Sequence, residues 1–485
     1  MNYGQFLQMI PEAFLVLALI VVFIADFALT KSKVKGHTLA CLTIGSLAIV
    51  TAVCFMAQPA TAFGGMYVAT QAANVMKVIL TAGALIVVVM AQPWVESSAL
   101  NVKNEGEFYM LILSTLLGMY MMTSSGNFLM FFLGLEMASV PMACLVAFDK
   151  YKKSSAEAAA KYILVATFSS GVMLFGISFV YGSVGTLYFD DIAQRIVYFA
   201  QYKSQVPMLL MGMVFFFSGL GFKLSLVPFH FWTADTYEGA PTPVTGYLSV
   251  VSKGAAAFAL MAILTKVFAP LTEYWEYVLY IVIVLSITIA NLFAIRQTEL
   301  KRFMAFSSIS QAGYIMLAVI GANQAGMAAL MYYTLVYVVA NMAVFTVIST
   351  VEHNNAGTTL MRSYDGLYQT NPKLAFLMTL ALFSLAGIPP FAGMFSKFFV
   401  FMAAAQQGSF WAYFVVFIAL VNTVVSLYYY LLIVKAMYIK SADNPLPTFR
   451  TDCMTRTALA LCTAGIVLFG ICSCIYDWLF AASAM

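Results

Sequence analysis

The stretch GLGFKLSLVPFHFW, residues 219–232, places a lysine and a proline inside an otherwise apolar segment. Proline lacks the backbone N–H and its ring clashes with the preceding helical turn, so we expect a helix that breaks at Pro228. A second stretch, SLAGIPPFAGMFSKFFVF at residues 384–401, has two prolines followed by Lys397. Each stretch therefore predicts a broken helix with a charged side chain beside the break.

The composition of the whole chain indicates that these helices lie in a membrane. Hydrophobic residues make up 62% of the 485 residues, charged residues only 9%, and the mean hydropathy is +0.91. Apolar runs of about 20 residues, the length that crosses a bilayer as a helix, recur along the chain. The predicted fold is an all-α polytopic membrane protein with about fourteen transmembrane helices and no soluble domain. The predicted spans are 9–29, 38–57, 72–92, 107–125, 127–148, 157–181, 207–227, 241–266, 276–295, 303–321, 326–350, 374–404, 409–435 and 457–481.

The two broken spans are the seventh and the twelfth, and they lie five spans apart. An odd offset reverses the direction of crossing, so spans 4–8 and 9–13 are predicted to form an inverted repeat of two five-helix units. We accordingly divide the chain into N-terminal helices (1–106), a first repeat (107–266), a second repeat (267–440) and a C-terminal span (441–485).

The distribution of lysine and arginine predicts the orientation. Sixteen of the 24 Lys and Arg residues fall in loops on one side of the predicted spans, three fall on the other side, and five lie inside spans. Short loops rich in these residues stay cytoplasmic, so both termini are predicted on the outer, periplasmic side. The N-terminal segment has no basic leader and its apolar run carries Glu12 and Asp26, so we expect the first span to be retained.

Glu136 is the single charged residue in FLMFFLGLEMASVPMACLVAF, residues 128–148. A carboxylate at that depth needs a cationic partner or must be neutral, and Lys223 is the natural candidate. A movable pair of this kind would switch the lysine between its charged and neutral forms. The alternative is a static ion pair that holds two helices together.

Two further lysines are candidates for the same path. Lys253 lies at the centre of span eight, in YLSVVSKGAAAFALM (247–261), where small neighbours leave room for water. Lys397 stands about two turns beyond Pro389, where an unwound backbone would supply polar groups. Snorkelling to an interface is the alternative, and the distance to either end of each helix disfavours it.

The remaining ionisable residues of the spans have more than one interpretation. Lys161 has Glu157 one turn before it, so an i, i+4 ion pair or snorkelling competes evenly with a transport role. His230 either passes protons or caps the broken helix. Lys77 lies near the end of its span and is predicted to be interfacial, with Glu12 and Asp26 terminal as well.

Several kinds of site find no support in the sequence. We find no GxxxxGK[ST] motif, no paired CxxC motif and no pair of histidines suited to haem, and so predict no nucleotide, iron–sulfur, haem or metal site in this chain. The seven cysteines are interpreted as small apolar fillers, with a redox role for Cys472 and Cys474 as the disfavoured alternative. Driving energy must therefore come from an ion gradient or from a partner.

Four stretches together carry a resemblance to a known family: FLGLEMASVP (132–141), GLGFKLSLVPFHFWTADTYEGAPTPVTGYLSVVSKGAAAF (219–258), TELKRFMAFSSISQAGYIM (298–316) and LAGIPPFAGMFSKFFVF (385–401). With them the chain resembles the antiporter-like membrane subunits of respiratory complex I, the proton-pumping NADH:quinone oxidoreductase. The resemblance extends over nearly the whole chain. It implies that Glu136, Lys223, Lys253 and Lys397 form the proton path, and Lys161 also matches a lysine of the family.

The resemblance further implies a subunit of the membrane arm, in a bacterial cytoplasmic membrane, that translocates protons while other subunits transfer electrons from NADH to quinone. NAD, flavin, iron–sulfur clusters and quinone would belong to those partners, which include homologous antiporter-like subunits, and no nucleic acid is involved. Many relatives carry histidine where this chain has Gln311. Since glutamine does not titrate, a relay there must use water or another side chain. A subunit of a multi-subunit cation/proton antiporter and a non-pumping scaffold subunit remain the alternatives.

Overall fold

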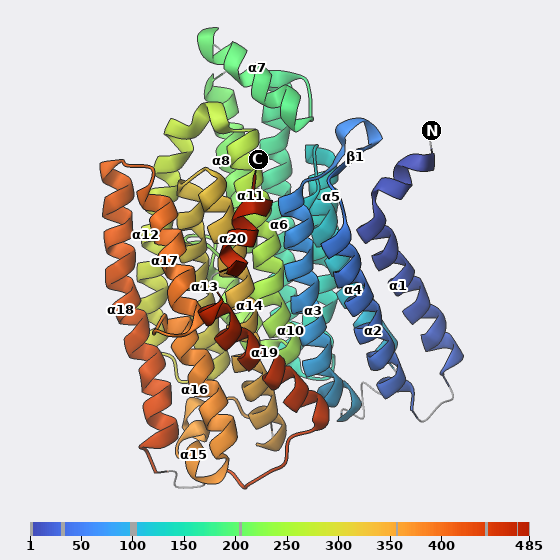
Figure 1. Ribbon diagram of the computed structural model, residues 1–485, viewed down its shortest axis with the longest axis vertical. Coiled ribbons are helices and arrows are strands. Elements are labelled where there is room, and N and C mark those ends of the chain that lie inside the picture. The colour runs from blue at the N-terminus through green and yellow to red at the C-terminus, as the bar shows by residue number, and fades with distance from the viewer. Residues whose placement is uncertain are drawn as a thin grey trace.

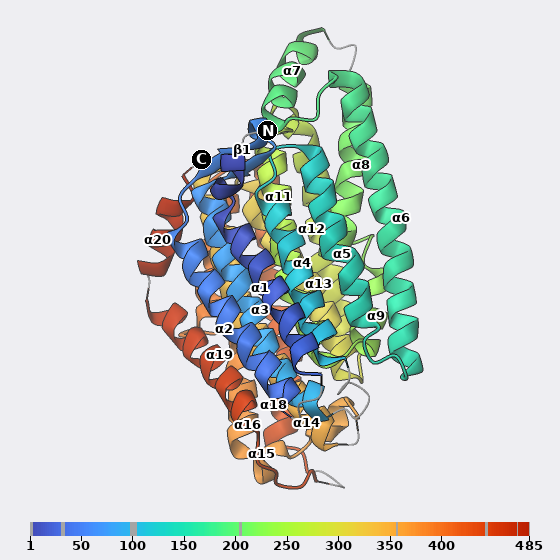
Figure 2. The ribbon, with the colours of Figure 1, turned by 90° about the vertical axis from the view of Figure 1, so that its right-hand side faces the viewer.

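The computed structural model describes residues 3–30, 34–97, 104–202, 206–355, 357–441, 445–472 and 474–484. Most of its helices run side by side along one axis, as expected of a membrane bundle (Figures 1 and 2). In the part of the chain that is described, twelve helices are long and apolar enough to cross a membrane. Lys31, Lys33, Lys103 and Lys203, which contribute to the loop charge, lie outside the described residues.

The elements of the N-terminal region and the first predicted repeat run to residue 266. They are η1 (Tyr3–Gln8), α1 (Ile10–Ala28), α2 (Lys35–Met56), β1 (Ala60–Ala62), η2 (Phe63–Gly65), β2 (Tyr67–Ala69), α3 (Gln71–Ser97), α4 (Glu105–Thr123), α5 (Phe128–Val146), α6 (Lys153–Val184), α7 (Phe189–Tyr202), α8 (Val206–Leu224), α9 (Phe231–Gly239), α10 (Thr242–Tyr247), the π-helical turn η3 (Leu248–Ser252) and α11 (Lys253–Lys266). The two strands form an antiparallel hairpin that pairs Ala60 with Ala69.

The elements of the second predicted repeat and the C-terminal region follow. They are η4 (Ala269–Leu271), α12 (Thr272–Ile295), α13 (Leu300–Ile320), α14 (Gln324–Asn354), η5 (Met361–Tyr364), α15 (Leu367–Thr370), α16 (Pro372–Ala386), α17 (Ala392–Ala405), α18 (Phe410–Tyr438), α19 (Cys453–Ile471) and α20 (Cys474–Ala482). Both termini lie toward the end of the bundle that carries α7, opposite α15 (Figures 1 and 2).

Helices occupy all fourteen predicted spans, so the all-α polytopic class is confirmed. Beyond the twelve long apolar helices, α4 and the shorter pair α16 and α17 occupy the other two spans. The number of crossings, the inverted repeat and the four-part division of the chain stay predictions. One span is wrong as a single helix: residues 457–481 form two helices, because α19 ends at Ile471 and α20 begins at Cys474. Sequence analysis also missed α7, which follows α6 with two aspartates in its first turn.

Glycines allow neighbouring helices of the first half to approach closely. A Cβ on Gly118 of α4 would lie 2.5 Å from the backbone nitrogen of Ala138, and one on Gly134 of α5 would lie 2.7 Å from that of Met122. Without a hydrophobic driving force between helices in lipid, such close backbone packing is a main source of association. The contact fixes α5, which carries Glu136, against the rest of the bundle.

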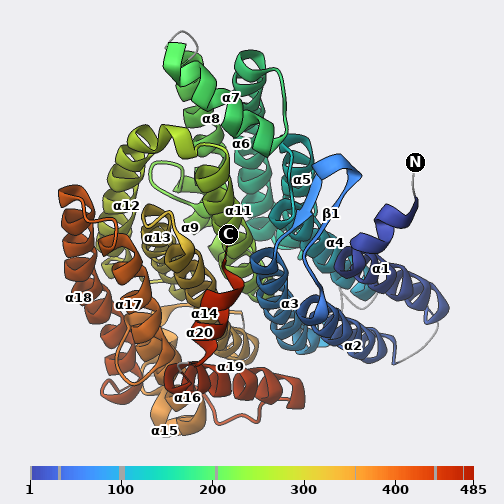
Figure 3. The same cartoon turned by 45° about the horizontal axis from the view of Figure 1, so that its top comes forward.

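The centre of the bundle is formed by helices that are buried on every side. All residues in the apolar stretch of α13 are buried (100%), and 89% of those in the apolar stretch of the α10 to α11 segment are buried. By contrast α1, α18 and α19 are each only 28% buried, and Figure 3 shows them around the rim while α13 and α14 lie inside. Lys253, Ser308 and Gln311, which are described next, therefore lie on the most buried helices of the protein.

Candidate functional site

The first break, residues 225–230, separates α8 from α9 and confirms the prediction for Pro228. The backbone groups that the break frees find partners. The N–H of Val227 donates to Ser286 Oγ of α12 at 2.9 Å, and Trp232 Nε1 donates to the carbonyl of Phe222 at 3.2 Å. Protein groups thus satisfy a break that would be costly in lipid.

Lys223, in the last turn of α8, is only 3% exposed. Its Nζ donates to Ser139 Oγ of α5 at 2.8 Å. The expected direct contact with Glu136 is not observed, because the Ser139 hydroxyl, one helical turn further along α5, takes the ammonium instead. Glu136 still acts on Lys223 electrostatically, and its Oε1 is buried without a hydrogen-bond partner. Lys223 is therefore bound to α5 at Ser139, one helical turn from Glu136.

His230 lies at the end of the first break and is 8% exposed. It occupies the position before α9, but its side chain makes no capping hydrogen bond. Its Nδ1 is buried and has no hydrogen-bond partner. The capping interpretation is thus not supported by the geometry, and the proton-passing interpretation stays a prediction.

Lys253 is 1% exposed and begins α11 directly after the π-helical turn. Its Nζ donates to Ser308 Oγ of α13 at 2.8 Å and lies 5.5 Å from the centre of the Tyr237 ring. The small neighbours do not open a wide space as expected. A Cβ on Gly254 would lie 2.5 Å from Thr334 Cγ2, so this residue serves close packing against α14.

The second break, residues 387–391, separates α16 from α17 and confirms the second predicted broken helix. Lys397, on α17, is 4% exposed. Its Nζ donates at 2.9 Å to the carbonyl of Ala386, the last residue of α16, and lies 5.0 Å from the centre of the Tyr314 ring. The break therefore supplies the lysine with a backbone carbonyl that a continuous helix would not offer.

Hydroxyl and amide groups of α13 lie between Lys253 and the second break. Gln311 donates through Nε2 to Tyr430 at 3.3 Å and to the carbonyl of Leu385, at the end of α16, at 3.4 Å. The Tyr333 hydroxyl donates to Gln311 Oε1. Tyr430 also bonds to Ser307 at 2.5 Å. Sequence reasoning missed these serines and tyrosines, and the signal it overlooked was hydroxyl groups recurring inside apolar spans.

Lys161 behaves differently from the buried lysines, because its side chain is 44% exposed. Its Nζ contacts Glu157 and Asp235, each at 2.7 Å. Arg302 of α13 joins the same group through Asp235 at 2.8 Å and Glu238 at 2.6 Å. The i, i+4 pair with Glu157 is confirmed, and these five residues form a surface ion network beside α9.

Lys77 corrects an expectation. It is 0% exposed, so it does not reach an interface, and its Nζ forms an ion pair with Glu12 at 2.6 Å. Tyr67 of the hairpin donates to Glu12 at 3.0 Å and accepts from Lys77 at 3.2 Å. The hairpin covers this pair, which is why a position near the end of a helix is nevertheless buried. Asp26 does lie near the end of α1 and pairs with Lys35 at 2.7 Å.

The structure thus holds Lys223, Lys253 and Lys397 each on its own uncharged acceptor. Among the described residues, no group of three or more His, Cys, Asp or Glu side chains could hold a metal ion. An ammonium on a single hydroxyl or carbonyl in a dry interior can lose its proton more readily than one in an ion pair. Lysines in such surroundings can take up and release protons.

Comparison with known proteins gives consistent results. Residues 125–426 match the family described as NADH:quinone oxidoreductase/Mrp antiporter, TM. The NADH-quinone oxidoreductase subunit N of Phocaeicola vulgatus is 57% identical over 479 residues, which cover 99% of this chain and 99% of that protein. The protein of the same name from Azobacteroides pseudotrichonymphae is 50% identical over 481 residues, covering 99% of this chain and 98% of that protein.

Among solved structures, the chain is similar to one in respiratory complex I from Thermus thermophilus with bound aureothin. The identity is 30%, the TM-score is 0.79, and the match covers 95% of this chain and 97% of that one. A chain of the Mrp complex from Dietzia sp. is 18% identical with a TM-score of 0.82, covering 99% and 97% of the two chains. At that identity the second likeness shows the fold alone.

Proposed function

Since the chain belongs to the NADH:quinone oxidoreductase and Mrp antiporter family of membrane subunits, we propose that its buried lysines carry protons across the membrane of a bacterial respiratory complex. The protein is a multi-pass membrane subunit of a proton-translocating NADH:quinone oxidoreductase. The observation that supports the path is the burial of Lys223, Lys253 and Lys397, each at 4% exposure or less, on a hydroxyl or carbonyl partner.

In the proposed path, protons reach Lys223 and Lys253 from the cytoplasmic side, near α8 and the α10 to α11 segment. They move along α13 to Lys397 and leave outward. Glu136 gates Lys223 electrostatically across Ser139, because a nearby negative charge favours the ammonium form. His230 and Lys161 are secondary, with Glu157 as the partner of Lys161.

The energy for transport comes from partner subunits. We propose that NAD, flavin, iron–sulfur clusters and quinone are bound there and not by this chain, so that the chain alone oxidises no NADH. Its partners are other membrane subunits of the complex, including antiporter-like ones. The orientation with both termini periplasmic rests on the sixteen basic residues of one set of loops and on the two termini lying toward one end of the bundle.

The test is NADH-driven acidification of inverted membrane vesicles, comparing wild type with Lys223→Ala after both complexes are shown to assemble. We expect Lys223→Ala to lower the number of protons moved per NADH. An unchanged ratio in an intact complex would overturn the path and favour the scaffold alternative. Sodium-dependent exchange without NADH would instead favour the cation/proton antiporter.

A further inference from the structure

Two pairs of polar side chains face each other where α13 packs against α14. The loop of residues 321–323 joins these helices, so they run in opposite directions. Gln311 and Tyr333 are hydrogen-bonded across the contact. On a helix, residues three or four apart share a face. One turn from that bond, Ser308 on α13 and Tyr337 on α14 therefore face each other too.

Gln311 closes its own position to proton transfer. Its amide oxygen accepts from Tyr333, and its amide nitrogen donates to Tyr430 and to the carbonyl of Leu385. A side-chain amide neither gains nor loses a proton in such a network. Gln311 thus holds the surrounding hydroxyls in place, but a proton that moves from Lys253 toward Lys397 has to pass beside it.

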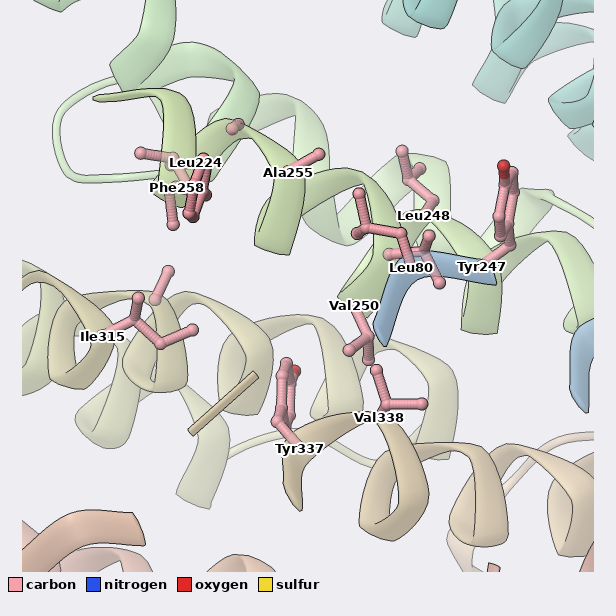
Figure 4. Packing of buried hydrophobic residues seen from close by; sticks show 14 of the residues in the cluster. Leu80, Leu224, Tyr247, Leu248, Val250, Ala255, Phe258, Ile315, Tyr337 and Val338 are labelled. Carbon is pink, nitrogen blue, oxygen red and sulfur yellow. The ribbon is translucent and has the colours of Figure 1, made fainter. Parts of the chain in front are cut away.

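Tyr337 lies beside Gln311, one turn away across the contact between α13 and α14. Tyr337 is 4% exposed, and its buried hydroxyl lies close to Ser308 without forming a well-aligned hydrogen bond. Figure 4 shows its ring pointing from α14 toward the segment that carries Val250, inside a shell of apolar side chains. Buried hydroxyls in folded proteins are normally well hydrogen-bonded, so this poorly bonded one is a candidate for a functional role.

A small cavity near the second break is lined by both Tyr337 and Lys397. Its volume is about 10 Å³, and its polar lining comes from Gln311, Tyr333, Tyr337, Ser384, Ser396 and Lys397. A single water needs at least about 10–15 Å³ and two to four polar partners. The cavity is at the lower limit of that volume, and it contacts Tyr337 and Lys397 together with four more polar residues.

We propose that the Tyr337 hydroxyl and one water in this cavity relay the proton from Lys253 and Ser308 to Lys397, past the inert Gln311. The Lys253 ammonium gives a proton to Ser308 Oγ. The Ser308 hydroxyl, which donates to the carbonyl of Ser249 at 3.4 Å, turns to pass its own proton to the Tyr337 oxygen. The Tyr337 proton passes to the water, and the water protonates the neutral amine of Lys397. Each hydroxyl gains one proton and loses one, so only the two lysines change charge. This inference rests on the proposed transport function.

The test uses the assembled complex in inverted vesicles and measures protons moved per NADH. We expect Tyr337→Phe, which removes one oxygen and keeps the ring, to lower this ratio as far as Lys397→Met does. The matched control is Tyr332→Phe, on the same helix, whose hydroxyl donates to the carbonyl of Phe469 of α19. It should keep the wild-type ratio. Equal loss in both variants would assign the effect to packing and overturn the relay.

A second variant tests the chemistry. Adding Gln311→His to Tyr337→Phe places a titratable ring beside the missing hydroxyl, and we expect it to restore protons per NADH toward wild type. A double variant no better than Tyr337→Phe overturns the relay, as does a wild-type ratio in Tyr337→Phe itself. Lys253→Met separates the two levels. If it lowers the ratio and Tyr337→Phe does not, the relay fails alone, and if it has no effect, the transport function fails.

Discussion

The two broken helices each place a buried lysine beside unwound backbone, but the electrostatic surroundings of the two lysines differ. At the first break Lys223 precedes the unwound residues. It donates to Ser139 of α5, and Glu136 of the same helix interacts with it electrostatically. At the second break the lysine follows the unwound residues and bonds to the carbonyl of Ala386. In the part of the chain that is described, no ion pair includes Lys397. A nearby carboxylate can therefore change the proton affinity of Lys223, whereas the proton affinity of Lys397 must depend on hydration and on a backbone carbonyl.

The largest effect should come from removing the feature that the two breaks share. Lys223→Met and Lys397→Met each delete an ammonium at one break, and we expect each to abolish the part of NADH-driven proton transport that runs through this subunit. Vesicle acidification per NADH measures it. Lys266→Met is the matched control, because this lysine ends α11 on the surface, 43% exposed and 2.9 Å from Asp190. If one of these two variants keeps its transport while the other loses it, the breaks do not act in series.

A smaller effect should distinguish the breaks. Glu136→Gln keeps the shape of the side chain but removes the charge that acts on Lys223, so we expect slower transport without complete loss. The initial rate of acidification measures it, and protons per NADH should fall less than in Lys223→Met. Glu276→Gln on α12 is the control, as a carboxylate bonded to Gln407 away from both breaks. A rate equal to wild type in Glu136→Gln would contradict the gating role.

Sequence alone predicted the breaks because proline acts locally. The effect of Pro228 on its own helix depends on the backbone and needs no knowledge of neighbours. The burial of Lys223, Lys253 and Lys397 was predictable for a similar reason, since their distance along an apolar run fixes their depth.

Contacts between helices could not be predicted in the same way. Whether Glu136 meets Lys223 directly or across Ser139 depends on how α5 and α8 are rotated, and spans that are apolar all round carry no signal of rotation. The burial of Lys77 depends on a hairpin that folds over it. Near the end of α19 the packing is equally close, because a Cβ on Gly470 would lie 2.6 Å from the carbonyl of Pro390 at the second break.

A further comparison concerns the serine at each break. Ser139 separates Lys223 from Glu136, so Ser139→Ala should let the two charges pair directly and slow release of the proton. Ser384 instead accepts from the N–H of Gly393 at 3.3 Å, so Ser384→Ala should act on structure. We expect Ser384→Ala to cost about 1 kcal/mol of stability. Thermal unfolding and acidification rates, measured on both variants, should show opposite patterns. The same pattern in both would mean that the serines have one common role.

The smallest effect concerns the surface ion network beside the first break. Burial raises the pKa of Asp235, but hydrogen bonds from Lys161 and Arg302 outweigh it and lower that pKa below the usual value of an aspartate. A carboxyl whose folded-state pKa is lowered stabilises the protein above its unfolded pKa, and this stabilisation is lost as the pH falls. The Asp235 side chain is 35% exposed, and exposed pairs contribute only about 0.2–1 kcal/mol each.

We therefore expect Asp235→Asn to lower the thermal unfolding temperature of the purified complex slightly between pH 5 and 8. This range lies roughly one unit or more above the pKa of about 3.9 that an aspartate has in the unfolded chain. The difference from wild type should shrink below about pH 4, where the carboxyl of the unfolded chain is protonated. Protons moved per NADH should stay close to wild type, because this network lies on the surface and Lys223 does not. A large loss of transport in Asp235→Asn would mean that the surface ion network, as well as Glu136, acts on proton transport at the first break. The two breaks would then differ more in their electrostatics than the buried residues alone indicate.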